Sequence, residues 1–247
     1  MKNIDSYTHV RGESVYLDDI PLQAGTLFAA LFDSPIAHGK IKSLNISEAS
    51  MMPEVVKIFT TRDIPGENQI GGIIKDEELL ADTQVHFCGM PVALVIANTD
   101  AAAKAAVKKI KMEVESLEII TDPRVAKEKG ELIIPPRTFQ LGDTVSAWKN
   151  CDYIFEGRTE TNGQEHLYIE TQGAYVLPQE NGALKVFSST QGPTAVQRTI
   201  AGVLGIAMNK VEVDTTRLGG GFGGKEDQAT AWAVLCALAA HDLKRPV

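Results

Sequence analysis

The chain has 247 residues and a formal net charge of −8, and 44% of its residues are hydrophobic. This length is sufficient for one large globular domain or two smaller ones. The acidic balance and the lack of a basic cluster disfavour nucleic acid and anionic membrane surfaces as partners. Because the first residues lack the apolar run of a signal peptide and no apolar stretch reaches membrane-spanning length, we expect a cytoplasmic protein.

The first part of the chain alternates strand and helix patterns. Strands are predicted at residues 26–32, 39–46, 55–60, 91–97 and 110–115. The fourth of these is apolar throughout, which predicts a strand covered on both faces. Thr99 or Asp100 can cap the helix predicted at residues 101–109, whose lysines are interpreted as a solvated face. We therefore expect a compact α+β domain in which a helix packs on a sheet.

The second part begins after a segment rich in charge and proline, residues 123–136, which is the best candidate for a linker. Alternation of polar and apolar residues predicts a strand at residues 151–161. A hairpin is predicted from residues 173–178 and 184–189, joined around Asn181-Gly182. The remaining predicted elements are a helix at residues 194–204 that stops at Gly205, a strand at 211–216 and a helix at 227–242.

The three cysteines, Cys88, Cys151 and Cys236, lie far apart and form no C-x-x-C pair. This spacing does not favour a zinc site, an iron–sulfur site or a disulfide framework built from this chain alone. Cys236 lies within an Ala- and Leu-rich helical pattern, so we interpret it as a buried helix thiol.

Five glycines surround one phenylalanine between the last predicted strand and the last predicted helix, from Gly219 to Gly224. Glycine tolerates φ > 0 and lets backbone N–H groups approach a ligand closely, so this loop is suited to an anion or a flat polar cofactor. The segment up to Lys225 matches the start of a phosphate-binding loop, but Glu226 stands where Ser or Thr would hold Mg²⁺. A dinucleotide-binding pattern also fits the glycines but lacks its second strand. Nucleotide binding is thus the weaker hypothesis. A purely structural turn is also disfavoured, because it needs fewer glycines than this loop contains.

Three polar positions are candidates for chemistry, and each has a plain structural alternative. His166 with Glu165 or Glu170 could form a base–orienter pair or bind a metal, although a structural hydrogen bond is favoured. Gln191 follows a strand and offers an amide that cannot ionise, or it caps the next helix. Glu226 could hydrogen-bond a polar substrate, or it is a helix-capping charge.

Several longer motifs, in the right order, resemble the molybdenum-binding subunit of the xanthine dehydrogenase and aldehyde oxidase family over nearly the whole length. Residues 163–170 and the glycine loop are similar to hallmarks of the family's first molybdenum-cofactor domain. The motifs that resemble its α/β hammerhead domain are residues 10–21, 34–41, 59–66 and 88–93, although Met90 stands where the family often has Gln. The resemblance implies an α+β architecture with a hammerhead domain at residues 1–122, a linker at 123–136 and the incomplete first part of a molybdenum-cofactor-binding α/β domain at 137–247.

The resemblance implies a molybdopterin-type cofactor, carrying molybdenum with oxo, sulfido and hydroxo ligands, in an oxidoreductase of purine catabolism. Such an enzyme inserts a water-derived oxygen into a purine, a related N-heterocycle or an aldehyde, and passes electrons to 2Fe-2S clusters and FAD on partner subunits or domains. By the motif match, Gln191 hydrogen-bonds a molybdenum oxygen ligand. Phe222, with the backbone of Gly223 and beside Gly221, lies against the apical oxo group. Glu226 corresponds to the carboxyl group that orients purines, which favours xanthine-type substrates.

The resemblance also implies that parts of the site lie elsewhere. The family's general base is a glutamate far towards the C-terminus, and a substrate-binding arginine and most pterin contacts also lie downstream. We therefore expect this chain alone to lack the base and to need a further C-terminal cofactor domain. The alternative is a non-catalytic structural or interaction remnant of the same fold, and the next open reading frame would discriminate the two.

Overall fold

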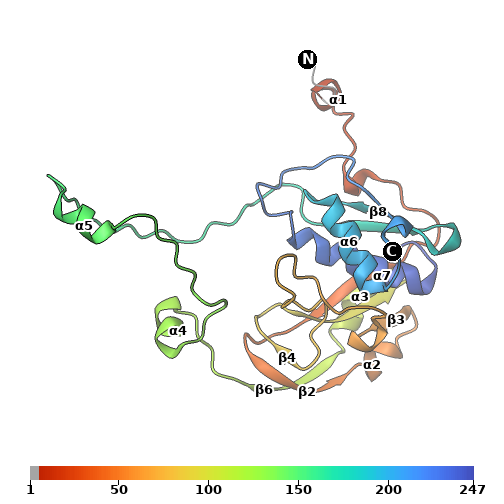
Figure 1. Ribbon diagram of the computed structural model, residues 1–247. Coiled ribbons are helices and arrows are strands. Elements are labelled where there is room, and N and C mark those ends of the chain that lie inside the picture. Colours follow the sequence, from red (N-terminus) through yellow and green to blue (C-terminus); the bar gives the residue numbers. More distant parts are fainter. Residues whose placement is uncertain (1–5) are drawn as a thin grey trace. The chain divides into compact units, whose positions relative to one another are not determined.

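The computed structural model describes residues 6–247, which divide into two units (Figure 1). The first unit contains the chain up to Glu118 together with His166–Val247, and the second is Ile119–Glu165. Within the described part of the chain, no helix is long and apolar enough to cross a membrane.

Two antiparallel three-stranded sheets form the N-terminal part of the first unit (Figure 1). One has the order β1-β5-β3 and the other β4-β2-β6. Their strands are β1 (Phe28–Asp33), β2 (Gly39–Asn45), β3 (Val55–Phe59), β4 (Gln84–Val85), β5 (Pro91–Ala97) and β6 (Lys111–Ser116). The helices in this part are α1 (Ser6–Arg11), α2 (Ser47–Ser50) and α3 (Asp100–Val107). The predicted strands of this part are confirmed, with shifts of one or two residues at their ends.

The central strand of the first sheet is β5, and it is buried along nearly its whole length. This explains its continuous apolar run, since one face packs towards α3 and the other towards the main core. Helix α3 begins at a true cap, because the Thr99 side-chain oxygen accepts a hydrogen bond from Ala102 N at 3.2 Å. Of the two predicted caps, Thr99 is therefore the one that is used.

Replacement of Thr99 by Ala is expected to lower the free energy of unfolding by about 1 kcal/mol, because it leaves a first-turn N–H without its acceptor. It also removes the hydrogen bond from Thr99 Oγ1 to Glu54 Oε2, at 2.8 Å. Urea unfolding of the purified chain measures the change. Thr99→Ser keeps the hydroxyl and serves as the control; an equal loss in both variants would contradict the capping role.

The C-terminal part of the first unit is a three-stranded sheet covered by two helices (Figure 1). Strands β7 (Ala174–Pro178) and β8 (Leu184–Ser188) form the predicted antiparallel hairpin, with Asn181 and Gly182 at positive φ in its turn. Helix α6 (Pro193–Leu204) crosses from β8 to the parallel strand β9 (Val211–Asp214) and ends at Gly205 in the left-handed conformation. Helix α7 (Gln228–Leu243) is mostly buried, including the Ala-rich stretch around Cys236. Burial raises the pKa of the Cys236 thiol to about 12, in line with an inert helix thiol.

The second unit contains two short helices, α4 (Pro123–Lys129) and α5 (Thr144–Lys149). Helix α4 lies in the segment predicted as a linker, where Asp122 caps it and Gly130 ends it. The strand predicted at residues 151–161 is wrong, because this segment has no regular structure and no strand of the described chain pairs with it. Alternating polarity makes a segment compatible with a sheet face, but a strand forms only where another strand accepts its hydrogen bonds.

Candidate functional site

The glycine loop lies between β9 and α7, as expected, but it ends before the helix begins at Gln228. Gly220 and Gly223 have φ of 97° and 90°, and Phe222 between them has φ of 51°. These left-handed conformations are open to glycine without steric cost and are unusual for phenylalanine. The loop thus turns back on itself and presents the Phe222 side chain, which is 74% exposed.

Three of the glycines are required by close contacts with neighbouring side chains. A Cβ atom on Gly219 would lie 2.4 Å from Glu170 Cβ. A Cβ atom on Gly221 would lie 2.4 Å from Gln191 Oε1, and one on Gly224 would lie 2.7 Å from Tyr168 Cε1. Real Cβ atoms do not approach other atoms this closely. The loop is therefore packed against the residues that follow β8 and against the segment that precedes β7.

Gln191 holds the glycine loop through its amide oxygen. Gln191 Oε1 accepts hydrogen bonds from Gly223 N at 3.0 Å and from Lys225 N at 3.2 Å, and Gln191 N donates to Lys225 O at 2.8 Å. The Gln191 Nε2 group has no hydrogen-bond partner among residues 6–247, and the residue is exposed. One end of the amide is thus bound to the loop, and the other is a donor open to a ligand.

The structure brings the predicted site residues Gln191, Gly221, Phe222, Gly223 and Glu226 together. Glu226 is exposed and lies beside the start of α6, since a Cβ atom on the glycine after Gln191 would be 3.1 Å from Glu226 O. The Gly223 N–H that was expected to face the cofactor points to Gln191 instead. Phe222 N–H has no partner within the described part of the chain, so it is a backbone donor available at this edge.

A buried ion pair beneath the loop was not anticipated from the sequence. Lys225 is 0% exposed, and its ammonium donates to Glu170 O at 2.6 Å, Ser189 Oγ at 2.6 Å and Glu170 Oε2 at 3.2 Å. These three acceptors satisfy all three N–H donors, and the ring of Tyr168 lies 4.6 Å from Lys225 Nζ. A lysine beside a glycine loop suggests phosphate binding, but this one is enclosed and fully paired. The arrangement therefore argues against the nucleotide-binding reading.

Glu170 is the anionic partner of this ion pair. Its Oε2 atom accepts further hydrogen bonds from Gly219 N and from Ser189 Oγ, each at 2.7 Å. Burial raises the pKa of the Glu170 carboxyl, but the hydrogen bonds from Gly219 and Ser189 and the charge of Lys225 outweigh it, so the pKa lies below the ordinary value. Glu170 is thus ionised and bound to the loop, which argues against the alternative in which it is the partner of His166.

The low pKa of Glu170 predicts how stability depends on pH. A carboxyl whose pKa is lower in the folded state stabilises the fold above its unfolded pKa, about 4.3, and this contribution is lost as the pH falls through the folded pKa. We expect Glu170→Gln to destabilise the chain at neutral pH and the difference from the unsubstituted chain to shrink below pH of about 4.3. Urea unfolding midpoints of both chains, measured from neutral pH to below about pH 4.3, test this expectation. Glu212→Gln, on an exposed carboxylate, is the control, and a difference independent of pH would contradict the assignment.

His166 lies at the rim of this cluster. Its ring centroid is 6.3 Å from that of Tyr168, and its side chain is exposed. Among residues 6–247, no three His, Cys, Asp or Glu side chains come together as a metal-ligand set. Gln172 continues the polar network, donating to Tyr168 OH at 2.7 Å and to Gly224 O at 3.1 Å and accepting from Trp232 Nε1 at 2.5 Å.

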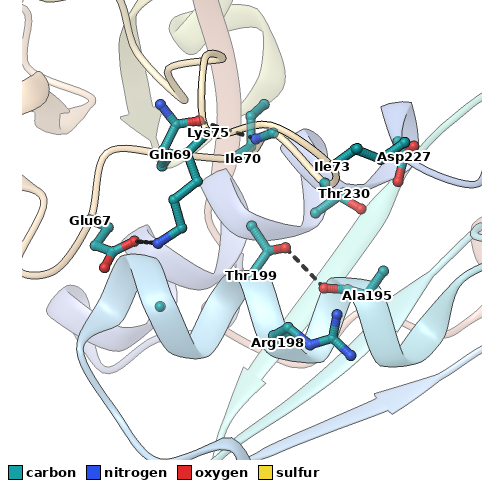
Figure 2. A pocket seen from close by; sticks show the side chains of 13 residues that line it. Glu67, Gln69, Ile70, Ile73, Lys75, Ala195, Arg198, Thr199, Asp227 and Thr230 are labelled. Atoms are coloured by element: carbon teal, nitrogen blue, oxygen red, sulfur yellow. Dashed lines mark hydrogen bonds and ion pairs between the residues drawn. The ribbon is translucent and has the colours of Figure 1, made fainter. Parts of the chain in front are cut away.

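A separate cavity of about 490 Å³ lies between residues 67–75, α6 and the start of α7 (Figure 2). Glu67 and Lys75 form an ion pair at its edge, and Thr199 Oγ1 donates to Ala195 O at 2.9 Å. Thr230 also lines it, and its buried hydroxyl has no partner within the described residues. None of the five predicted site residues lines this cavity, so it is distinct from the glycine-loop site.

Comparison with protein families divides the chain into two parts. Residues 11–118 match the family model described as the a/b hammerhead domain of aldehyde oxidase and xanthine dehydrogenase. Residues 125–247 match the model described as the molybdopterin cofactor-binding domain. The glycine loop, Gln191 and the buried ion pair all lie within the second match.

Relatives and solved structures agree with these matches. Xanthine dehydrogenase of Dictyostelium discoideum is 37% identical over 100% of this chain, and aldehyde oxidase 2 of Macaca fascicularis is 36% identical over 99%. The chain spans 18% of the length of each of these relatives. Aldehyde oxidoreductase from Desulfovibrio gigas has a TM-score of 0.86 at 28% identity, covering 99% of this chain and 29% of that one. The expected hammerhead and molybdenum-cofactor architecture is thereby confirmed.

Proposed function

The chain belongs to the xanthine dehydrogenase and aldehyde oxidase family, and from this premise we propose that it forms one wall of the active site of a molybdenum hydroxylase. The observation that carries the proposal is the amide of Gln191. Its oxygen is held by two loop N–H groups, while Nε2 is left open next to the exposed Phe222. This arrangement provides a neutral hydrogen-bond donor of fixed orientation.

The residues present fit a molybdopterin cofactor at this edge. A Cβ atom on Gly223 would meet nothing within 4 Å, and Phe222 is mostly exposed, so the outer side of the loop is open to a ligand. Gln191 Nε2 and Phe222 N–H are the donors that would meet oxygen ligands of the metal, and the metal would have no direct protein ligand here. When bound, the cofactor accepts the electrons that leave the substrate as a water-derived oxygen is inserted.

The chain's own side chains can orient the substrate. Glu226 is exposed beside the loop and can hydrogen-bond the polar edge of a purine or a related N-heterocycle. Gln191 cannot ionise, so its donor is present at every working pH. Xanthine-type purines are the proposed substrates, with aldehydes second, because a carboxyl group at Glu226 favours ligands that carry ring N–H groups.

The chain spans 18% of the length of the curated relatives, so the activity of a complete enzyme depends on further parts. Following the family resemblance, we propose that a glutamate base, most pterin contacts, 2Fe-2S clusters and FAD are provided by other domains or subunits. A cytoplasmic location is proposed as well.

Substitution of Glu226 tests the proposed substrate class. In the complete enzyme that contains this chain, Glu226→Ala is expected to lower kcat/KM for a purine by roughly 100-fold, because loss of a charge-assisted hydrogen bond to the substrate costs about 1.5–3 kcal/mol. Oxidation of an aldehyde should change less. Glu180→Ala, in the β7–β8 turn, is the matched control. Unchanged purine oxidation in the Glu226 variant would reject the assignment.

A further inference from the structure

The ion pair between Lys225 and Glu170 joins the two ends of the glycine loop. Lys225 is the residue after the last glycine, and Glu170 accepts the N–H of the first one, Gly219, at 2.7 Å. Glu170 N also donates to Gly219 O at 3.2 Å. A contact between Lys225 Nζ and Glu170 Oε2 at 3.2 Å therefore closes the loop at its base.

The same lysine connects this closed loop to Gln191. Its backbone N–H donates to Gln191 Oε1 at 3.2 Å, and its backbone oxygen accepts from Gln191 N at 2.8 Å and from Thr190 Oγ1 at 3.1 Å. Its ammonium also bonds Ser189 Oγ at 2.6 Å. Three consecutive residues after β8 thus contact one buried lysine, and the orientation of the Gln191 amide follows from the position of Lys225.

We propose that Lys225 and Glu170 are positioning residues that clasp the glycine loop shut and thereby direct Gln191 Nε2 towards the open edge of the site. Neither side chain touches a ligand in this role. This proposal rests on the proposed function in one respect only, namely that the Gln191 amide faces the cofactor. The clasp itself is a property of the chain without cofactor.

The clasp gives the buried ion pair a role other than net stability. Buried ion pairs add little net stability over well-packed apolar residues, but they require one geometry. Here that geometry places two glycine N–H groups and one amide relative to each other. Loss of the pair should therefore affect the loop more than the helices behind it.

Amide hydrogen exchange of the cofactor-free chain, read by mass spectrometry, tests the clasp. The double variant Glu170→Gln/Lys225→Met removes both charges and leaves no unpaired buried ion. We expect exchange of peptides covering residues 219–225 to accelerate at least tenfold, while peptides from α6 and α7 keep their rates. Lys185→Met/Glu212→Gln removes an exposed ion pair between β8 and β9 and should leave the loop unchanged.

Two results would overturn the proposal. Loop exchange within twofold of the unsubstituted chain would show that the pair does not hold the loop. Equal acceleration of exchange in the loop and in α6 and α7 would show a general structural role. The single variant Glu170→Gln, which keeps the side-chain volume, repeats the comparison of loop and helix exchange rates. Since no cofactor is present, either result leaves the proposed function standing, and failure of the Glu226 test leaves the clasp standing.

Discussion

Replacing Gly221 by Ala is expected to lower kcat of the complete enzyme by about 10²–10³-fold. It should also lower the free energy of unfolding by about 1–3 kcal/mol, because the two hydrogen bonds that Gln191 Oε1 accepts from the loop are lost. The new methyl group would lie 2.4 Å from Gln191 Oε1 and 2.7 Å from Gln191 Cδ, so the amide must swing away from the loop. The backbone itself accepts alanine, because Gly221 does not have positive φ. The variant therefore displaces the donor and keeps the fold.

Turnover of a purine and of an aldehyde should fall together, because Gln191 is proposed to face the cofactor rather than the substrate. Steady-state kinetics and urea unfolding of the same preparations separate the two effects. Gly202→Ala is the matched control, since a Cβ atom at this position of α6 would meet nothing within 4 Å. Its helix should gain up to about 1 kcal/mol from alanine. Full turnover in the Gly221 variant would refute the role of Gln191.

Replacing Lys225 by Met alone is expected to lower the free energy of unfolding by about 3–5 kcal/mol. The substitution leaves the mostly buried Glu170 carboxylate without the ammonium, and it leaves Ser189 Oγ without the N–H donor of Lys225. Loss of one partner of a buried ion pair costs far more than the pair contributes as a whole. Urea unfolding followed by circular dichroism measures the loss.

Lys185→Met, on strand β8, provides a comparison for the loss of stability in the Lys225 variant. Lys185 pairs with Glu212 at 2.9 Å, but the Glu212 side chain is 69% exposed, so the expected loss is below about 1 kcal/mol. A loss of similar size in both variants would contradict the assignment of Lys225 as a buried, paired charge.

Local patterns account for most of the fold that could be predicted. Apolar runs and periods, together with turn and cap residues, located β5, α3, the β7–β8 hairpin, α6 and α7, because these signals depend on neighbours within a few residues. The same local reasoning placed a strand at residues 151–161, where it was wrong. A strand needs a partner whose position depends on the whole fold, and alternation cannot supply that information.

The glycine loop shows where sequence reasoning about a site reaches its limit. The sequence pattern alone resembled the start of a phosphate-binding loop, in which Lys225 would be the phosphate-binding cation and Glu226 is the residue that does not fit the pattern. In the structure Lys225 is buried and Glu226 is exposed. The lysine therefore supports the loop from within, and the glutamate is the side chain that a ligand can reach. Five glycines beside a lysine were a signal of close packing, but the partner of that lysine lies 55 residues earlier.

The sequence by itself determined the order of the main elements outside residues 119–165, the presence of a loop that must approach other groups closely, and five residues of the candidate site. Motifs at long spacing also determined the family resemblance, since each motif is continuous in the chain. Only the tertiary structure decided that Gln191 offers its nitrogen and not its oxygen, and that Glu170 belongs to Lys225 rather than to His166. These outcomes depend on distances between segments far apart in the chain, because a hydrogen bond forms only within about 3.2 Å and the attraction of an ion pair weakens as its charges separate.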